Sequence, residues 1–99
     1  MLILGLCASA PACAAGYRRH DRAVQRVDRH AYDIGFRDGV GAGRDDARHH
    51  ERFDPIRAKR YRQGDHDYDR RYGARDDYQR EYRAGFQQGY EQGYRQYRR

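Results

Sequence analysis

A twelve-residue pattern of tyrosine, phenylalanine and glycine occurs twice in this chain, and the second copy begins fifty residues after the first. In each copy glycine recurs at every fourth position, and a larger side chain precedes each glycine by three positions. Four residues are slightly more than one α-helical turn, so each copy forms a glycine stripe beside an aromatic stripe on one helix. The positions are Tyr32, Gly35, Phe36, Gly39, Val40 and Gly43, and then Tyr82, Gly85, Phe86, Gly89, Tyr90 and Gly93.

Glycine inside a helix costs about 1 kcal/mol relative to alanine, so the three glycines of one copy cost their helix about 3 kcal/mol. Close approach of another helix or of aromatic rings to a backbone without side chains can offset this cost. We therefore predict that the twelve positions form a helix-packing interface within the chain, with the rings of one helix over the glycines of the other. Two alternatives stay open: pairing of the same stripes between chains, and a flexible tract without stable helices.

The first copy continues a helical pattern that begins further upstream. Val24, Val27 and Ile34 recur at helical spacing. Asp21 precedes them as a candidate N-cap, which predicts a helix from about residue 22 to about residue 49.

The segment after this helix contains turn signals. Asp54 as a cap and Pro55 as the first helical residue predict a short second helix to about Gln63. Gly64 is suited to close that helix, because glycine readily adopts the left-handed conformation of a C-terminal cap. Residues 65–75 carry no periodicity and are predicted to form a loop.

A last helix is predicted from Asp76, whose spacing to Gln79 resembles a capping box, to about Tyr97. No segment shows the alternation or the β-branched enrichment of strands. The fold class is therefore predicted as all-α. Two long glycine- and tyrosine-striped helices, joined by a short helix and a loop, predict an antiparallel helical hairpin preceded by a signal segment.

An uncharged, apolar run covers residues 2–15 and ends in the small residues Ala12, Cys13 and Ala14, which resemble a signal-peptidase site. This predicts a signal peptide over residues 1–15, truncated at its start because it lacks a basic region, and a helical-hairpin domain over residues 16–99. The domain is expected to be exported, to the periplasm or outside the cell. A short buried N-terminal helix and a lipid-modified cysteine are the alternatives.

The charge pattern bears on partners. The net charge is +6, and arginine supplies all but one of the 21 basic residues. Aspartate is interleaved with arginine along the chain, which is typical of a solvated surface and weakens the case for nucleic acid that a basic chain otherwise makes. Tyrosine and arginine near the C-terminus keep an anionic polymer or surface, or nucleic acid, as an alternative partner. Self-association or another envelope protein is the favoured prediction.

Serine, threonine and cysteine nucleophiles are missing from residues 16–99 of the sequence. The chain has no threonine, and its one serine (Ser9) and two cysteines (Cys7 and Cys13) lie in the predicted signal peptide. This removes the usual nucleophiles. Many carboxylates lie beside arginines, an arrangement that favours their charged form over the protonated form that a general acid needs. We expect no enzymatic activity, no cofactor and no small-molecule substrate.

One acidic segment resembles the start of a calcium loop. Asp65, Asp67 and Asp69 alternate, and Asp76 stands at the twelfth position. Arg70 replaces the glycine that such loops need at the sixth position, so a hydrogen-bonded turn is favoured. A module that binds calcium or a transition metal through these four aspartates, with His66, remains the alternative function.

The histidines give a weaker metal signal. His49 and His50 are adjacent, and neighbouring residues on a helix point about 100° apart, so both cannot bind one ion without breaking the helix. His66 lies elsewhere in the sequence. We predict a solvated pair at residues 49 and 50 and no metal site.

The order of these features resembles that of small exported proteins of environmental bacteria, notably acidobacterial types, for which no function is assigned. The shared features are a signal peptide, a G-x-x-x-G helix, an Asp-Pro linker, a Tyr-Gly turn and a closing Y-R-x-G-[FY]-x-x-G-Y helix. Here they are residues 35–43, Asp54-Pro55, Tyr72-Gly73 and residues 82–94. A looser similarity, in the glycines alone, exists to the helices of a eukaryotic protein-assembly adaptor. The resemblance covers nearly all of residues 16–99 and implies no function. From the residues themselves we predict an exported, non-enzymatic structural or interaction protein.

Overall fold

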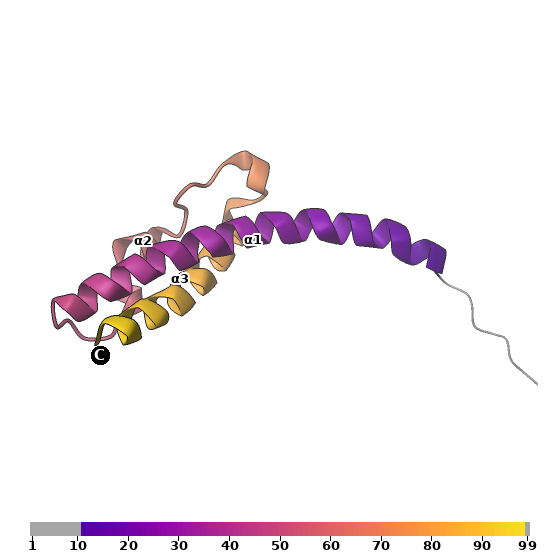
Figure 1. The fold of residues 1–99 in the computed structure, drawn as a ribbon. Helices are drawn as coiled ribbons and strands as arrows, with labels where there is room; N and C mark the ends of the chain where they lie inside the picture. The colour runs from indigo at the N-terminus through magenta and orange to yellow at the C-terminus, as the bar shows by residue number, and fades with distance from the viewer. Residues whose placement is uncertain (1–10, 99) are drawn as a thin grey trace, which may run out of the picture.

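A computed structural model describes the backbone of residues 11–98 and the side chains of residues 29–98. Two long helices, α1 (Pro11–Arg48) and α3 (Arg75–Arg98), pack against each other (Figure 1). Between them lie the 3-10 turn η1 (Pro55–Arg57), the short helix α2 (Lys59–Gln63) and the 3-10 turn η2 (Arg70–Tyr72). The described part of the chain contains no strand, so the predicted all-α class is confirmed.

The two long helices run in the same direction, as their colours show in Figure 1. Their backbone contacts advance together along the chain, from Gly35 against Tyr82 to Gly43 against Tyr90. The predicted antiparallel direction is therefore wrong, although two long helices do pack together as predicted. The physical reason is the length of the connection. Residues 49–74 return beside the pair before α3 begins, and they form the segment that we call the crossover.

The first helix is longer than predicted. It is already helical at Pro11, so Asp21 lies inside the helix and does not cap it. No glycine or proline occurs between Tyr17 and Ile34, and the charged and apolar residues there are acceptable in a helix interior. The predicted signal peptide falls on residues 1–10, which lie outside the described part, and on the first residues of α1, whose side chains are not described. It stays a prediction.

The C-terminus of α1 is closed by a Schellman motif without glycine. His50 adopts a φ of 59° and donates its backbone N–H to the carbonyl of Ala47 at 3.1 Å. The N–H of Glu51 reaches the carbonyl of Asp46 at 2.7 Å. These two bonds satisfy carbonyls that the last turn leaves free. Histidine thus occupies a left-handed position that glycine adopts at lower cost.

The caps of the shorter elements agree only in part with the sequence patterns. Gly64 ends α2 in the left-handed conformation, as predicted. The side chain of Asp54 makes no cap hydrogen bond at η1. Gln79 donates its side-chain amide to the carbonyl of Gln63 at 2.8 Å, which ties α3 to the end of α2 in place of the predicted capping box.

The core is a column of rings along α3. Neighbouring rings of the column have centroids 5.9 to 6.5 Å apart. Rings of the crossover, such as Phe53, Tyr61 and Tyr68, meet the column edge-on. Four of the five column rings are tyrosines, so this core needs hydrogen-bond partners as well as packing. The column consists of Tyr78, Tyr82, Phe86, Tyr90 and Tyr94, and Ala31 and Ile34 of α1 are buried with it.

We predict that His50→Gly stabilises the protein. Relief of the left-handed conformation is expected to raise the free energy of unfolding by about 1 kcal/mol, as measured by chemical denaturation. His49→Gly is the matched control, because His49 is an exposed neighbour without a positive φ. This control is expected to lower the stability. Equal effects of the two changes would contradict the assigned cap.

Candidate functional site

Each glycine of one copy of the pattern lies against a backbone carbonyl of the other copy. A Cβ built on Gly39 would lie 2.2 Å from the carbonyl oxygen of Phe86, and one built on Gly89 would lie 2.0 Å from that of Phe36. Such distances leave room for a hydrogen atom but not for a methyl group. The other contacts, at 2.0 to 2.3 Å, join Gly35 to Tyr82, Gly43 to Tyr90, Gly85 to Tyr32 and Gly93 to Val40.

The structure thus brings all twelve predicted positions together, but the contact differs in kind from the prediction. Carbonyl oxygens, not rings, lie over the glycines. The glycine hydrogen that takes the place of Cβ points at the facing oxygen, which is the geometry of a Cα–H···O contact between helices. The rings lie on the flanks, because two backbones at this separation leave no space for them. Within one chain the stripes are therefore already occupied.

The contacts obey an internal two-fold relation. Exchanging the two copies turns the contact of Gly39 with Phe86 into the contact of Gly89 with Phe36, so an approximate two-fold axis runs along the pair. Two parallel helices with the same motif produce this reciprocity. The crossover is the sequence feature that indicates the parallel direction. It is long enough to run back along the pair, and it carries rings of its own, including Phe53 and Tyr61.

Every buried hydroxyl of the tyrosine column has an acceptor outside α3. Two hydroxyls donate to carboxylates of α1 and two donate to backbone carbonyls after it. Among the described side chains, no buried polar atom lacks a partner. The bonds run from Tyr82 to Asp38 (2.6 Å), from Tyr90 to Asp46 (2.5 Å), from Tyr78 to the His66 carbonyl (2.7 Å) and from Tyr94 to the Glu51 carbonyl (2.7 Å).

Asp38 joins three parts of the fold. Its Oδ2 accepts from the Tyr82 hydroxyl and lies 2.5 Å from His66 Nδ1 and 3.5 Å from an Arg60 guanidinium nitrogen. The carboxylate side chain is only 17% exposed, so loss of these partners would leave a poorly hydrated charge. The residue thus ties α1 to α3 and to the crossover.

Asp46 repeats this role two helical turns later. It accepts from the Tyr90 hydroxyl and pairs with Arg57 at 3.2 Å. The sequence patterns did not single out either aspartate. The sequence feature that indicates the pairing is the separation of eight residues between Asp38 and Asp46, which equals the separation between Tyr82 and Tyr90.

Burial changes the chemistry of the column hydroxyls. Burial first, and then nearby charges led by Asp67, raise the pKa of Tyr78 to about 12. Burial and the hydrogen bond to Asp46 raise the pKa of Tyr90 to about 12 as well. For Tyr82, burial and the hydrogen bond to Asp38 also raise the pKa. These phenols therefore stay protonated and act as hydrogen-bond donors, not as bases or nucleophiles.

The aspartates of the calcium-loop alternative do not converge. Three of them have separate partners, and the fourth is exposed on the first turn of α3. Within the described range, no group of three or more histidine, cysteine or acidic side chains is placed to hold a metal ion. This geometry does not support the alternative. The pairs are Asp65 with Arg75 (3.3 Å), Asp67 with His30 (3.2 Å) and Asp69 with the Arg71 backbone N–H (2.9 Å), and Asp76 is the exposed one.

The histidines act as structural contacts. His30 stacks on Tyr72 with ring centroids 4.1 Å apart. His66 bonds to Asp38, so both residues fasten the crossover to α1. His49 Nδ1 lies 2.7 Å from the Asp45 carbonyl, and His49 is exposed.

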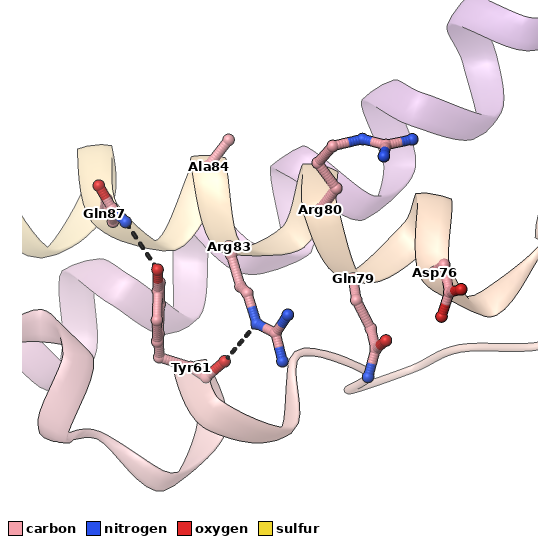
Figure 2. Close-up of a pocket in the computed structure, with 7 residues that line it drawn as sticks. All are labelled: Tyr61, Asp76, Gln79, Arg80, Arg83, Ala84 and Gln87. Carbon is pink, nitrogen blue, oxygen red and sulfur yellow. Dashed lines mark hydrogen bonds between the residues drawn. The ribbon is translucent and has the colours of Figure 1, made fainter.

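A surface hollow of about 510 Å³ lies between α2 and α3 (Figure 2). Arg83 Nε donates to the Tyr61 carbonyl at 3.0 Å, and Gln87 Nε2 donates to the Tyr61 hydroxyl at 2.8 Å. The polar groups that line the hollow thus fasten α2 to α3. The lining residues are Tyr61, Asp76, Gln79, Arg80, Arg83, Ala84 and Gln87.

No helix in the described part of the chain has the length and apolar character needed to cross a membrane. Comparison with protein-family models, with curated proteins and with solved structures gave no match.

We predict that Gly39→Ala lowers the free energy of unfolding by about 1 to 3 kcal/mol, because its methyl group would overlap a backbone carbonyl. Gly41→Ala is the control on the same helix, since among the described residues no atom outside the adjacent turns of its own helix lies within 4 Å of the added methyl. It is expected to stabilise by up to about 1 kcal/mol. Chemical denaturation measures both effects. Stabilisation by both variants would contradict the packing.

The combination of Gly39→Ala with Gly89→Ala is expected to cost less than the sum of the single changes. Both methyl groups act on the same close approach, so the separation forced by the first relieves the second. The measurement is a double-mutant cycle of unfolding free energies. Strict additivity would show that the two contacts are independent.

The raised pKa values predict a loss of stability at high pH. Unfolded tyrosines ionise near pH 10, whereas folded Tyr78 and Tyr90 keep their protons to about pH 12. This stabilisation is therefore fully present below pH 10 and is lost as the pH rises from about 10 to about 12. Denaturation at increasing pH should show a smaller loss for Tyr90→Phe than for the wild type. Tyr97→Phe, at an exposed ring, is the control and should lose as much stability as the wild type. If Tyr90→Phe also lost as much stability as the wild type, the raised pKa of Tyr90 would not contribute to the pH dependence.

Proposed function

We propose that the chain is an exported, non-enzymatic interaction protein, in which the paired helices form a rigid scaffold and one face of the pair binds a macromolecular partner. Export rests on the apolar run at residues 2–15. The absence of serine, threonine and cysteine from residues 16–99 supports a role in binding. The buried hydroxyls are likewise engaged in structural bonds.

The observation that carries this proposal is a stripe of large side chains on α1 that stays partly exposed. Tyr32, Phe36 and Val40 occupy the same motif positions as Tyr82, Phe86 and Tyr90, which are at most 1% exposed. The three α1 residues are only partly buried. A row of large side chains on a rigid helix pair is a typical binding surface. We call this surface the open face.

The parallel pair is well suited to present such a face. Backbone contacts at six glycines hold the helices at one separation. Hydrogen bonds from Tyr82 to Asp38 and from Tyr90 to Asp46 resist rotation of one helix about the other. A scaffold of this kind loses little conformational entropy when a partner binds.

Site-specific photo-crosslinking in producing cells tests the proposal. A benzophenone amino acid in place of Phe36 should give defined adducts on irradiation. The control is the same substitution at Phe53, which is 45% exposed and packs against the α3 column. Adducts from position 36 that are absent from position 53 are the expected result. Equal labelling at the two positions, or none at position 36, would contradict the proposed binding face.

A further inference from the structure

The two flanks of the helix pair are related by the internal two-fold relation but are covered unequally. On one flank the crossover buries the α3 column, and its rings meet Tyr90 and Phe86 edge-on. On the other flank the equivalent α1 side chains, including Phe36, stay partly exposed. Within the described residues, the chain therefore covers one of two similar surfaces.

A hollow of about 340 Å³ marks the open face. Its wall on α3 contains a row of glutamines that recur every fourth residue and are exposed. Phe36 of α1 forms the apolar part of the wall. The α3 residues are Gln88, Glu91, Gln92, Arg95 and Gln96.

The row of glutamines is unusual in this chain, in which 36% of residues are charged and the net charge is +6. The two charged residues of the hollow, Glu91 and Arg95, pair with each other at 3.1 Å. The hollow is therefore electrically neutral. A neutral surface does not favour an acidic or a basic partner, and it avoids like-charge repulsion when it meets a copy of itself.

On the covered flank, acidic side chains of α1 meet basic side chains of the crossover. Fifty residues before Gln88 and Gln96, the equivalent positions hold Asp38 and Asp46. These carboxylates accept bonds from tyrosine hydroxyls of α3 and pair with basic groups of the crossover, such as Arg57. On the open face amides replace the carboxylates. An amide both donates and accepts, so it can bond to an identical amide across a two-fold axis, whereas a carboxylate cannot.

We propose, on the basis of the binding role assigned to the open face above, that its partner is the same face of a second copy. The two α1·α3 pairs then form a two-fold dimer of four helices. Phe36 packs near the axis, and the row of Gln88, Gln92 and Gln96 faces the row of the second chain. The glycine stripes stay inside each chain and take no part in this contact.

Sedimentation velocity of the full chain over a range of concentrations tests the dimer. The wild type should show a reversible monomer–dimer equilibrium. Gln92→Glu and Gln92→Arg should each raise the dissociation constant about tenfold or more, because like charges then meet across the axis. An equimolar mixture of the two variants should restore the dimer, since opposite charges meet.

Gln87→Glu is the matched control, because it makes the same charge change as Gln92→Glu at another exposed glutamine of α3. Gln87 points to Tyr61 on the covered flank. This variant should dimerise as the wild type does. A wild type that is monomeric at every concentration would overturn the inference. Dimers that are unaffected by both Gln92 variants, or equally weakened by Gln87→Glu, would overturn it too.

The outcome separates this inference from the proposed function. A monomeric chain that still gives adducts from position 36 with a different protein retains the binding role and loses the second copy as partner. A monomeric chain without adducts at position 36 loses both. A dimer that gives self-adducts from position 36 supports both.

Discussion

The rest of the described fold depends on the contact between two glycine stripes. Carbonyl oxygens of each helix lie where the other helix carries only hydrogen, so α1 and α3 approach more closely than helices with side chains between them. At this separation the rings must turn to the flanks, where α3 forms its column. The column in turn requires acceptors for its hydroxyls, and Asp38 and Asp46 supply two of them from α1. The crossover completes the core by covering one flank.

The positions of the helices and of their interface were predictable from short-range sequence patterns. The features that were predicted wrongly or not at all depend on contacts between residues that are distant in the sequence. Four-residue spacing identified both helices and their interface, and Gly64 identified the end of α2. The helix direction was not predictable from the stripes, because the spacing alone does not distinguish parallel from antiparallel pairing. The predicted cap at Asp21 is wrong, because α1 is already helical from Pro11 onward. The roles of Asp38 and Asp46 were not predictable from local patterns, because their hydrogen-bond partners are distant in the sequence.

The two copies of the pattern are related by an approximate two-fold axis, but the crossover covers only one of the two flanks. This difference supports the proposed binding role. One copy of the pattern keeps its aromatic stripe buried under the crossover, and the other keeps Tyr32, Phe36 and Val40 partly exposed. The buried tyrosines serve as structural donors, and burial raises their pKa values further above the ordinary value of about 10. The proposed binding surface therefore lies on the outside of the helix pair and not in its interior. Its neutral row of glutamines distinguishes it from the charged remainder of the chain.

The parallel glycine contact is tested most directly by nuclear Overhauser effects in the folded protein. A Cβ on Gly43 would lie 2.9 Å from the backbone nitrogen of Tyr94, and one on Gly35 would lie 3.1 Å from that of Phe86. The α-protons of Gly43 should therefore show cross-peaks to the amide proton of Tyr94, and those of Gly35 to the amide proton of Phe86. Cross-peaks that instead connect Gly43 to residues near the start of α3, and Gly35 to residues near its end, would show an antiparallel pair and contradict the structure described.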